Sequence, residues 1–245
     1  MKLSVDKRPR LDDEVRHFSN NHHIWWGVKT FAGQERYKYR FQLIKKLCRP
    51  RKMTKVLEIG CGDGEFTKHL ATLPGIVVAT DATRAVIDQI RKKYQPKNLR
   101  LRVENCEQLS FRDSTFDIVC GTSILHHVST VKALMEAYRV LKPKGKIFFS
   151  EPNLLNPIAY AAYNSNWLRQ KMEFTSHEMA FTRFYVSRLL EDIGFKNIEV
   201  NNSDFLYPST PSFLVPFISR LSRVIEATPI IKEISGSLII SAQKN

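Results

Sequence analysis

The sequence predicts an α/β fold built around a mostly parallel β-sheet. From Lys55 onward, short β-branched and apolar runs alternate with helical patterns, which is typical of βαβ units. Three glycines follow the first of these runs directly, and Asp81 follows the second. Apolar residues make up 43% of the 245 residues, enough for a proper core.

The first half of this pattern predicts three strands, at residues 55–59, 76–80 and 99–103. A helix separates the first two strands, and its apolar residues recur at helical spacing: Phe66, Leu70 and Leu73. A second helix, marked by Val86, Ile87, Ile90 and Tyr94, is closed by Pro96. The third strand alternates apolar residues with arginine, which indicates that one face is partly exposed to water.

The second half predicts four more strands, at residues 116–120, 146–150, 198–200 and 238–241. A helix with Leu134, Tyr138 and Leu141 on one face is expected to end at the breaker residues 142–145. Another helix, with Leu189, Leu190 and Ile193 on one face, is expected to end at Gly194. The predicted organisation is an N-terminal helical or lid segment at 1–54 and one domain at 55–245, with an apolar insert at 203–235.

The formal charge of +14 is concentrated at the N-terminus, since residues 1–55 hold 15 Lys/Arg and 5 Asp/Glu, a net of +10. This excess indicates either attraction to an anionic partner, such as nucleic acid, a phosphorylated substrate or a membrane surface, or simply a solvated helix face. No apolar run approaches the roughly 18 residues of a membrane span, and no secretory signal is visible, so a cytoplasmic protein is expected. The four cysteines form no CxxC pair, and no metal site is expected.

The glycines at 60, 62 and 64 stand between a strand and a helix, where residues without a Cβ let the backbone pass close to a ligand. A purely structural tight turn would use glycine in the same way. Asp81, at the end of the second strand, can accept both hydroxyls of a ribose, and it can also cap the next helix. Together these residues predict an adenosine-containing cofactor.

Three segments in order resemble the class I S-adenosylmethionine-dependent methyltransferases, in particular their ubiquinone/menaquinone-type branch of small-molecule enzymes. They are residues 56–64 (VLEIGCGDG), residues 107–119 (EQLSFRDSTFDIV) and residues 139–146 (RVLKPKGK). The resemblance covers residues 55–150. It implies a Rossmann-like fold with a seven-stranded, mostly parallel sheet flanked by helices, an N-terminal helical segment and a helical insert before the last strand. It also implies S-adenosyl-L-methionine as cofactor.

The resemblance assigns cofactor-binding positions along the chain. Glu58 would support the amino-acid end of the cofactor, and Asp81 with Ala82 would meet the ribose. Asn105 departs from the family's usual acidic residue, although its amide oxygen can still accept from the adenine amino group. The remaining expected cofactor contacts are Gly60, Cys61, Gly62, Gly64, Cys106 and Thr122.

His126, His127 and Glu151 are the candidate catalytic residues, because they follow the fourth and fifth strands where the crevice is expected. Either histidine could remove a proton from an acceptor hydroxyl, or instead cap a helix or pack beneath the site. Glu151 could contact substrate, serve as an alternative base, or bond nearby backbone. The Asn/Asp-Pro-Pro-aromatic signature of enzymes that methylate amines is absent after the fourth strand, which disfavours nucleic-acid amines as acceptors.

Trp25 and Trp26 lie in a motif, residues 22–26 (HHIWW), that resembles one found ahead of the core in some small-molecule methyltransferases. They are expected either to line a lid at the acceptor or to anchor a helix. The insert could be a lid, a membrane-surface patch, a dimer interface or plain packing, and we expect it to bury its apolar load. The expected reaction is methyl transfer to a small-molecule or lipid-linked acceptor, at oxygen. The alternatives are an RNA or protein methyltransferase and a non-catalytic partner subunit.

Overall fold

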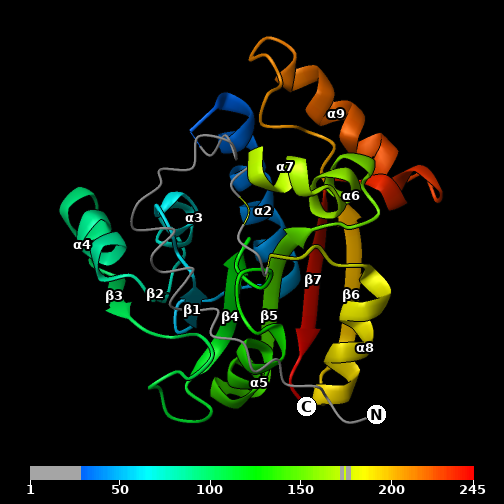
Figure 1. Ribbon diagram of the computed structural model, residues 1–245. Coiled ribbons are helices and arrows are strands. Elements are labelled where there is room, and N and C mark those ends of the chain that lie inside the picture. Colours follow the sequence, from blue (N-terminus) through cyan, green and yellow to red (C-terminus); the bar gives the residue numbers. More distant parts are fainter. Residues whose placement is uncertain (1–28, 172–173, 175–177) are drawn as a thin grey trace.

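A computed structural model describes residues 29–171, 174 and 178–245. Its centre is a seven-stranded sheet with the order β3-β2-β1-β4-β5-β7-β6, in which only β7 runs antiparallel to its neighbours (Figure 1). The predicted fold class is confirmed. The strands are β1 (Lys55–Ile59), β2 (Ile76–Asp81), β3 (Leu99–Val103), β4 (Phe116–Thr122), β5 (Leu141–Pro152), β6 (Lys196–Ser203) and β7 (Ser237–Gln243).

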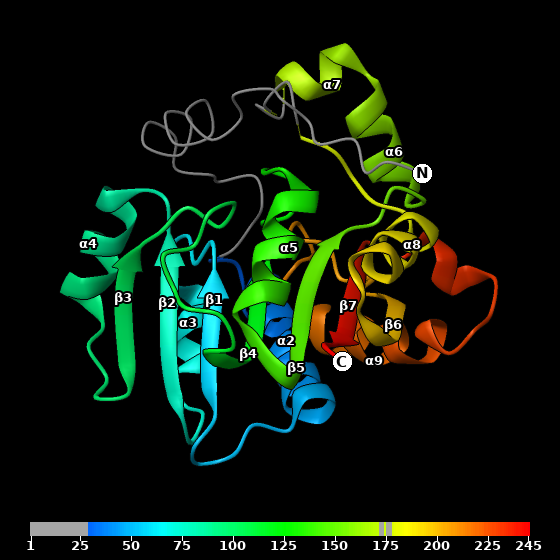
Figure 2. The same cartoon turned by 90° about the horizontal axis from the view of Figure 1, so that it is seen from below.

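Helices cover both faces of the sheet, with α2 and α5 on opposite sides (Figure 2). One face packs against α5 and α8 through a cluster that includes Leu57, Leu134 and Leu190. The other packs against α2, α3 and α4 through a cluster that includes Val56 and Ile44. The helices are α2 (Phe31–Cys48), α3 (Glu65–Leu70), α4 (Arg84–Lys93), α5 (Thr130–Val140), α6 (Pro157–Asn164), α7 (Asn166–Lys171), α8 (Arg183–Ile193), α9 (Val215–Glu226) and the short 3₁₀ helix η1 (Ile231–Ile234). In the described part of the chain, no helix has the length and apolarity needed to cross a membrane.

The fifth strand begins earlier than the sequence predicts, because the breaker residues form a bulge rather than a loop. Leu141 pairs with Phe116, and the pairing resumes at Lys146 opposite Ile118. Lys144 lies among the extra residues of this bulge and adopts a positive φ of +63°. The prediction that residues 142–145 separate helix from strand was wrong, since the α5 helix passes directly into β5.

Two short helices, α6 and α7, follow β5 and were not predicted. The first is capped by Asn156, whose side-chain oxygen accepts the N–H groups of Ile158 and Ala159, and Pro157 opens it. Their sequence, with few charges and no clear apolar stripe, carries little helical periodicity. The chain then returns to the sheet edge, where Asn153 and Phe181 form a β-bridge.

The insert between β6 and β7 contains α9 and η1. Both β5 and β6 are antiparallel to β7, so their carboxyl ends lie at the same edge of the sheet, and the insert leaves from that edge. Leu206 and Val215 pack with Ala32 of α2. The expectation that the insert buries its apolar load was wrong for its outer side chains: Phe213 is 79% exposed and Phe217 65%.

Candidate functional site

The candidate site lies at the carboxyl edge of the sheet, between the loops that follow β1 and β4. These strands are neighbours, yet the chain runs outward from them in opposite directions, to β2 and β3 on one side and to β5 on the other. Such a switch point opens a crevice in doubly wound sheets. The loops come close, because a Cβ on Gly60 would lie 2.5 Å from the Ile124 side chain. Gly60 is therefore required for packing between the two loops.

The glycine loop adopts backbone conformations that favour glycine, with positive φ at Gly60, Gly62 and Gly64 (+66°, +50° and +83°). Its middle residue, Gly62, faces open space: a Cβ built there would have no described atom within 4 Å. Cys61 is buried, its N–H donates to Thr80 O at 2.9 Å, and burial raises the pKa of its thiol well above the ordinary value. The loop is thus fixed from beneath and open above Gly62.

Asp81 connects the end of β2 to this loop. Its Oδ2 accepts the Gly62 N–H at 3.1 Å, and its Oδ1 accepts the Thr83 N–H at 2.9 Å. The bond to Thr83 forms a turn ahead of α4, whose N-cap is Thr83, so Asp81 does not cap this helix; the carboxylate is instead held in a fixed position beside the glycine loop. Each oxygen retains a further lone pair for a ligand hydroxyl. Ala82, the next residue, is partly buried.

Glu58 is buried beneath the loop, where its Oε2 accepts the Thr67 hydroxyl at 2.7 Å. Burial raises the pKa of Glu58 to about 8, although the Thr67 hydrogen bond opposes the shift; nearby Asp81 and Asp63 add to it. Among its described contacts, this side chain ties β1 to α3. Its expected contact with the cofactor stays a prediction.

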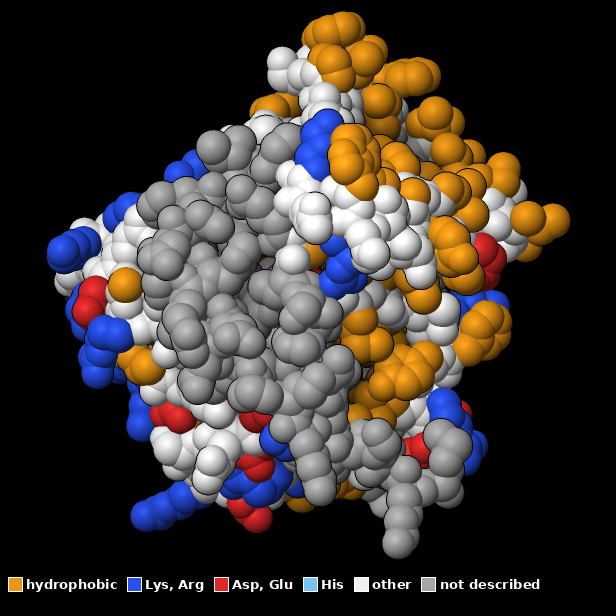
Figure 3. Space-filling model, in the orientation of Figure 1, with side chains coloured by type: hydrophobic (Ala, Val, Ile, Leu, Met, Phe, Trp, Pro, Cys, Tyr) orange, Lys and Arg blue, Asp and Glu red, His pale blue; other side chains and the backbone are white. Residues whose placement is uncertain are grey.

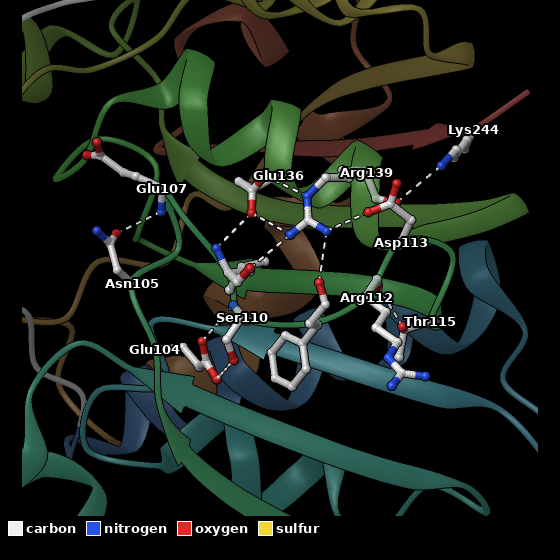
Figure 4. Close-up of polar contacts among 12 residues, drawn as sticks. Glu104, Asn105, Glu107, Ser110, Arg112, Asp113, Thr115, Glu136, Arg139 and Lys244 are labelled. Atoms are coloured by element: carbon white, nitrogen blue, oxygen red, sulfur yellow. Dashed lines mark hydrogen bonds and ion pairs between the residues drawn. The ribbon is translucent and has the colours of Figure 1, made fainter.

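Asn105 and Cys106 lie in the loop after β3, which starts beside Asp81, because the Glu104 N–H donates to the Asp81 carbonyl oxygen at 3.0 Å. The Asn105 Oδ1 accepts the Glu107 N–H at 2.8 Å, so the oxygen expected to meet adenine already shapes a tight turn (Figure 4). Cys106 is buried, and this burial raises the pKa of its thiol to about 12, with smaller contributions from the charges of Glu107 and Asp81. Asn105 therefore offers a ligand only its second lone pair and its amide N–H₂ group.

A salt-bridge network holds this loop in place (Figure 4). Arg139 on α5 donates to the carbonyl oxygens of Leu109 and Phe111, and it pairs with Glu136 and Asp113. The Glu136 carboxylate in turn accepts the Leu109 N–H at 2.7 Å. The two sequence segments that carry the family resemblance after β3 and at the end of α5 are therefore in direct contact.

His126 and Glu151 are brought together by β4 and β5. The His126 Nδ1 lies 2.7 Å from Glu151 Oε2, and both side chains are buried. Glu151 Oε1 accepts the N–H groups of Ile124 and Leu125 at 3.0 and 2.9 Å. Glu151 therefore bonds both nearby backbone and the imidazole.

His127 lies beside this pair, with its ring centroid 4.0 Å from that of His126. Its Nδ1 is 3.6 Å from Oε1 of Glu178, a buried residue that the sequence analysis did not single out. The three residues His126, His127 and Glu178 offer ligand atoms within 4.8 Å of one another, a donor set that suits zinc or a similar divalent ion. No sequence spacing pointed to it, because Glu178 is brought in by the return of the chain after α7.

The α2 helix supplies two further site residues that sequence reasoning missed. The hydroxyl of Tyr37, a partly buried residue, contacts Thr122 at the end of β4, and desolvation by the surrounding protein raises the pKa of Tyr37. The Arg40 guanidinium lies 5.5 Å from the Tyr37 ring centroid and contributes positive charge near Glu151. Trp25 and Trp26, the expected substrate residues, lie outside the described residues.

Known proteins match this chain most clearly in the region that carries the site. A sequence model of a methyltransferase domain family matches residues 57–149. The ubiquinone biosynthesis O-methyltransferase of Bartonella tribocorum is 28% identical over 204 residues, covering 75% of this chain and 81% of that protein. An uncharacterized methyltransferase-like protein of Schizosaccharomyces pombe is 33% identical over 93 residues, covering 38% of this chain. The chain spans 36% of the length of that relative and of a second one from the same yeast.

Solved structures share the whole architecture. A Thermotoga maritima protein described as a possible histamine N-methyltransferase superimposes with a TM-score of 0.68 at 20% identity, covering 96% of this chain and all of that one. A methyltransferase from Archaeoglobus fulgidus superimposes with a TM-score of 0.64 at 17% identity, covering 91% and 100%. At these identities the likeness shows the fold. With the family match over residues 57–149 and the distant quinone-pathway relatives, the chain is similar to the class I S-adenosylmethionine-dependent methyltransferases, and this likeness implies S-adenosylmethionine as the methyl donor.

The residues present fit this cofactor. Among the described residues the space above Gly62 is empty, a cradle that any side chain would fill, and the Asp81 carboxylate lies beside it. An adenosine cofactor needs such a glycine-lined approach together with a carboxylate that accepts ribose hydroxyls. Asp81 and Gly62 would hold the ribose and the adjoining part of the cofactor, and the loop of Asn105 would face adenine.

Proposed function

We propose that this protein transfers a methyl group from S-adenosylmethionine to the oxygen of a small-molecule or lipid-linked acceptor. The observation that carries the proposal is the contact between His126 and Glu151 at the ends of β4 and β5. Oxygen is favoured because a hydroxyl must lose a proton as it becomes an ether, and a histidine oriented by a carboxylate can take that proton. The O-methyltransferase named above, similar over 75% of this chain, supports the same reaction.

The chain's own groups have defined tasks in this reaction. When bound, the cofactor supplies a methyl group on a positively charged sulfur. Asp81 and the glycine loop orient it, and orientation provides much of the rate enhancement when the methyl group is already activated. A neutral His126 that donates from Nδ1 to Glu151 leaves Nε2 free to accept the acceptor's proton.

The three catalytic candidates thus receive different roles. His126 is the proposed base, and Glu151 is a positioning residue, because its oxygens bond Ile124, Leu125 and His126. His127, held near Glu178, is the second candidate for contact with the acceptor. Trp25 and Trp26 remain proposed acceptor contacts of the N-terminal segment.

Methyl transfer is tested by incubating the full chain with S-adenosylmethionine labelled in the methyl group and separate pools of phenolic compounds, polar lipids, RNA and protein. We expect the methyl label to appear in phenolic compounds or lipids and to resist mild alkali, because an ether is stable to base. The His126→Ala variant should not transfer this label. Label that enters RNA or protein instead would support the alternative acceptors. Cofactor binding with no label in any pool would favour the non-catalytic alternative.

A further inference from the structure

Exposed apolar side chains gather along one border of the molecule, over α6, α7, α9 and η1 (Figure 3). We call this surface the apolar rim. It is continuous through the start of α6, because the Asn156 side chain donates to the Ile234 carbonyl oxygen of η1 and to the Tyr207 hydroxyl. Its members are Leu155, Ile158, Tyr160, Trp167, Phe213, Leu214, Phe217, Leu221, Val224, Ile230, Ile231 and Ile234.

The α9 helix shows that this exposure is built into the fold. Its inner face carries polar groups: Ser222 Oγ accepts the Phe205 N–H, and Glu226 accepts the Asp204 N–H and the Tyr39 hydroxyl. These bonds fix the rotation of the helix, and Phe217 and Val224 consequently point outward, 65% and 67% exposed. A helix on a water-facing surface normally has the reverse arrangement. The outer face is therefore suited to an apolar medium.

Basic residues outnumber acidic ones along the rim. Within residues 155–171 and 205–234 the chain has Arg169, Lys171, Arg220, Arg223 and Lys232, and its acids are Glu233, which pairs with Arg183, and Glu226. Glu226 is tied to Tyr39, Ser203, Ser222 and the backbone of Asp204 on the inner face. Among the described residues, Arg220 has no acidic partner. An apolar surface with exposed basic groups, whose acidic groups already have partners within the protein, matches the headgroup region of an anionic bilayer.

We infer that the apolar rim docks the protein on the surface of a lipid bilayer that contains anionic lipids. A second copy of the chain is a poorer occupant, because two such rims would bring like charges together. The aromatic side chains of Trp167, Tyr160 and Phe213 suit the boundary between headgroups and acyl chains.

The rim borders the edge of the sheet where the candidate site lies. The α6 helix follows β5, the strand that contains Glu151, after a short turn. The insert begins at the carboxyl end of β6, which lies at the same edge of the sheet as the carboxyl end of β5. A docked bilayer would therefore lie near the crevice, as a lipid-linked acceptor requires. Docking itself needs no methyl transfer, so its test is independent of the proposed function.

The test is sedimentation of the full chain with vesicles of phosphatidylcholine and phosphatidylglycerol (3:1) and with vesicles of phosphatidylcholine alone. We expect binding to the anionic vesicles that weakens with salt. The double variant Phe213→Ser/Phe217→Ser should weaken this binding by roughly a hundredfold, and Arg220→Gln/Lys171→Gln by roughly tenfold. The matched controls, Met53→Ser/Met135→Ser and Lys92→Gln/Lys93→Gln, change equally exposed residues on other surfaces and should bind as the wild type does.

Thermal unfolding of each variant establishes that it is folded before binding is compared. Folded wild type that stays in solution with anionic vesicles overturns the inference, and so does equal loss of binding in the control variants. Sedimentation velocity without lipid provides a further test. A dimer that the Phe213→Ser/Phe217→Ser variant abolishes would show that a second copy covers the rim.

Discussion

The Nδ1 atom of His126 lies 2.7 Å from Oε2 of Glu151, across the ends of two adjacent strands. Glu151 belongs to β5, and its Oε1 accepts the N–H groups of Ile124 and Leu125, so the turn after β4 that carries His126 is bonded directly to the neighbouring strand. The pair has the arrangement of a histidine oriented by a carboxylate. Four predictions follow from this site and from the residues that support it.

Replacing His126 with alanine should lower turnover by roughly a hundredfold or more, with cofactor affinity retained, because only proton removal is lost. Glu151→Gln should have a smaller effect on turnover, because the amide oxygen can still accept the imidazole N–H and keep the ring oriented. The measurement is turnover against pH with labelled S-adenosylmethionine. His69→Ala, which changes a partly buried histidine on α3, is the control. Normal turnover in His126→Ala would show that His126 is not the base, and that either His127 takes the proton or no base is needed.

Replacing Asp81 with alanine should weaken S-adenosylmethionine binding by roughly 1.5–3 kcal/mol, or about tenfold to a hundredfold, because a charged acceptor of hydrogen bonds is lost. Asp81→Asn keeps one oxygen and should lie between alanine and wild type. Calorimetric titration measures both, with Asp88→Ala on the exposed side of α4 as the control. Unchanged affinity in Asp81→Ala would place the ribose elsewhere.

Glu58 should make the protein less stable as the pH rises. Its pKa is about 8 in the folded chain and ordinarily 4.5, so between these values the folded state holds a proton that the unfolded state has released. The contribution is therefore fully present below about pH 4.5 and is lost as the pH rises to about 8, by up to about 1.4 kcal/mol per pH unit. Urea unfolding across this range should show the slope in wild type and not in Glu58→Gln. The exposed Glu191→Gln should retain it.

Replacing Arg139 with lysine should loosen the loop of Asn105 even though the charge is kept. A lysine cannot bond Leu109, Phe111, Glu136 and Asp113 at once, because it lacks the planar fork of the guanidinium. We expect a loss of roughly 1.5–3 kcal/mol in unfolding free energy and faster hydrogen exchange in residues 104–113. Arg188→Lys, in an exposed ion pair, should change neither. A loop that exchanges at the wild-type rate would show that Arg139 does not hold it.

Part of the candidate site could be predicted from the sequence because its signals are local. Gly62 and Asp81 each follow a strand with strong apolar periodicity, and strand ends at one sheet edge must converge. The sequence could not show that Glu151 contacts His126 and the backbone of Ile124 and Leu125, since this depends on side-chain directions across two strands.

Other residues could not be predicted because they reach the site by tertiary packing alone. Glu178 comes from a segment without periodicity that returns to the sheet edge at Phe181. Tyr37 and Arg40 lie on α2 among many charged residues, and nothing in their spacing distinguishes them from a solvated face. The exposure of Phe213 and Phe217 was also unforeseen, because an apolar pattern alone indicates burial.

The most direct test of the account is calorimetric titration of the full chain with S-adenosylmethionine and, separately, with NADH. We predict one molar equivalent of S-adenosylmethionine bound, no binding of NADH, and loss of binding in Gly62→Val, whose side chain would fill the open space above the loop. Thermal unfolding shows that this variant is folded, and Gly194→Ala, far along the chain at the end of α8, controls for changes at a glycine of positive φ. Tight binding of NADH by the wild-type chain, with no binding of S-adenosylmethionine, would contradict the central claim.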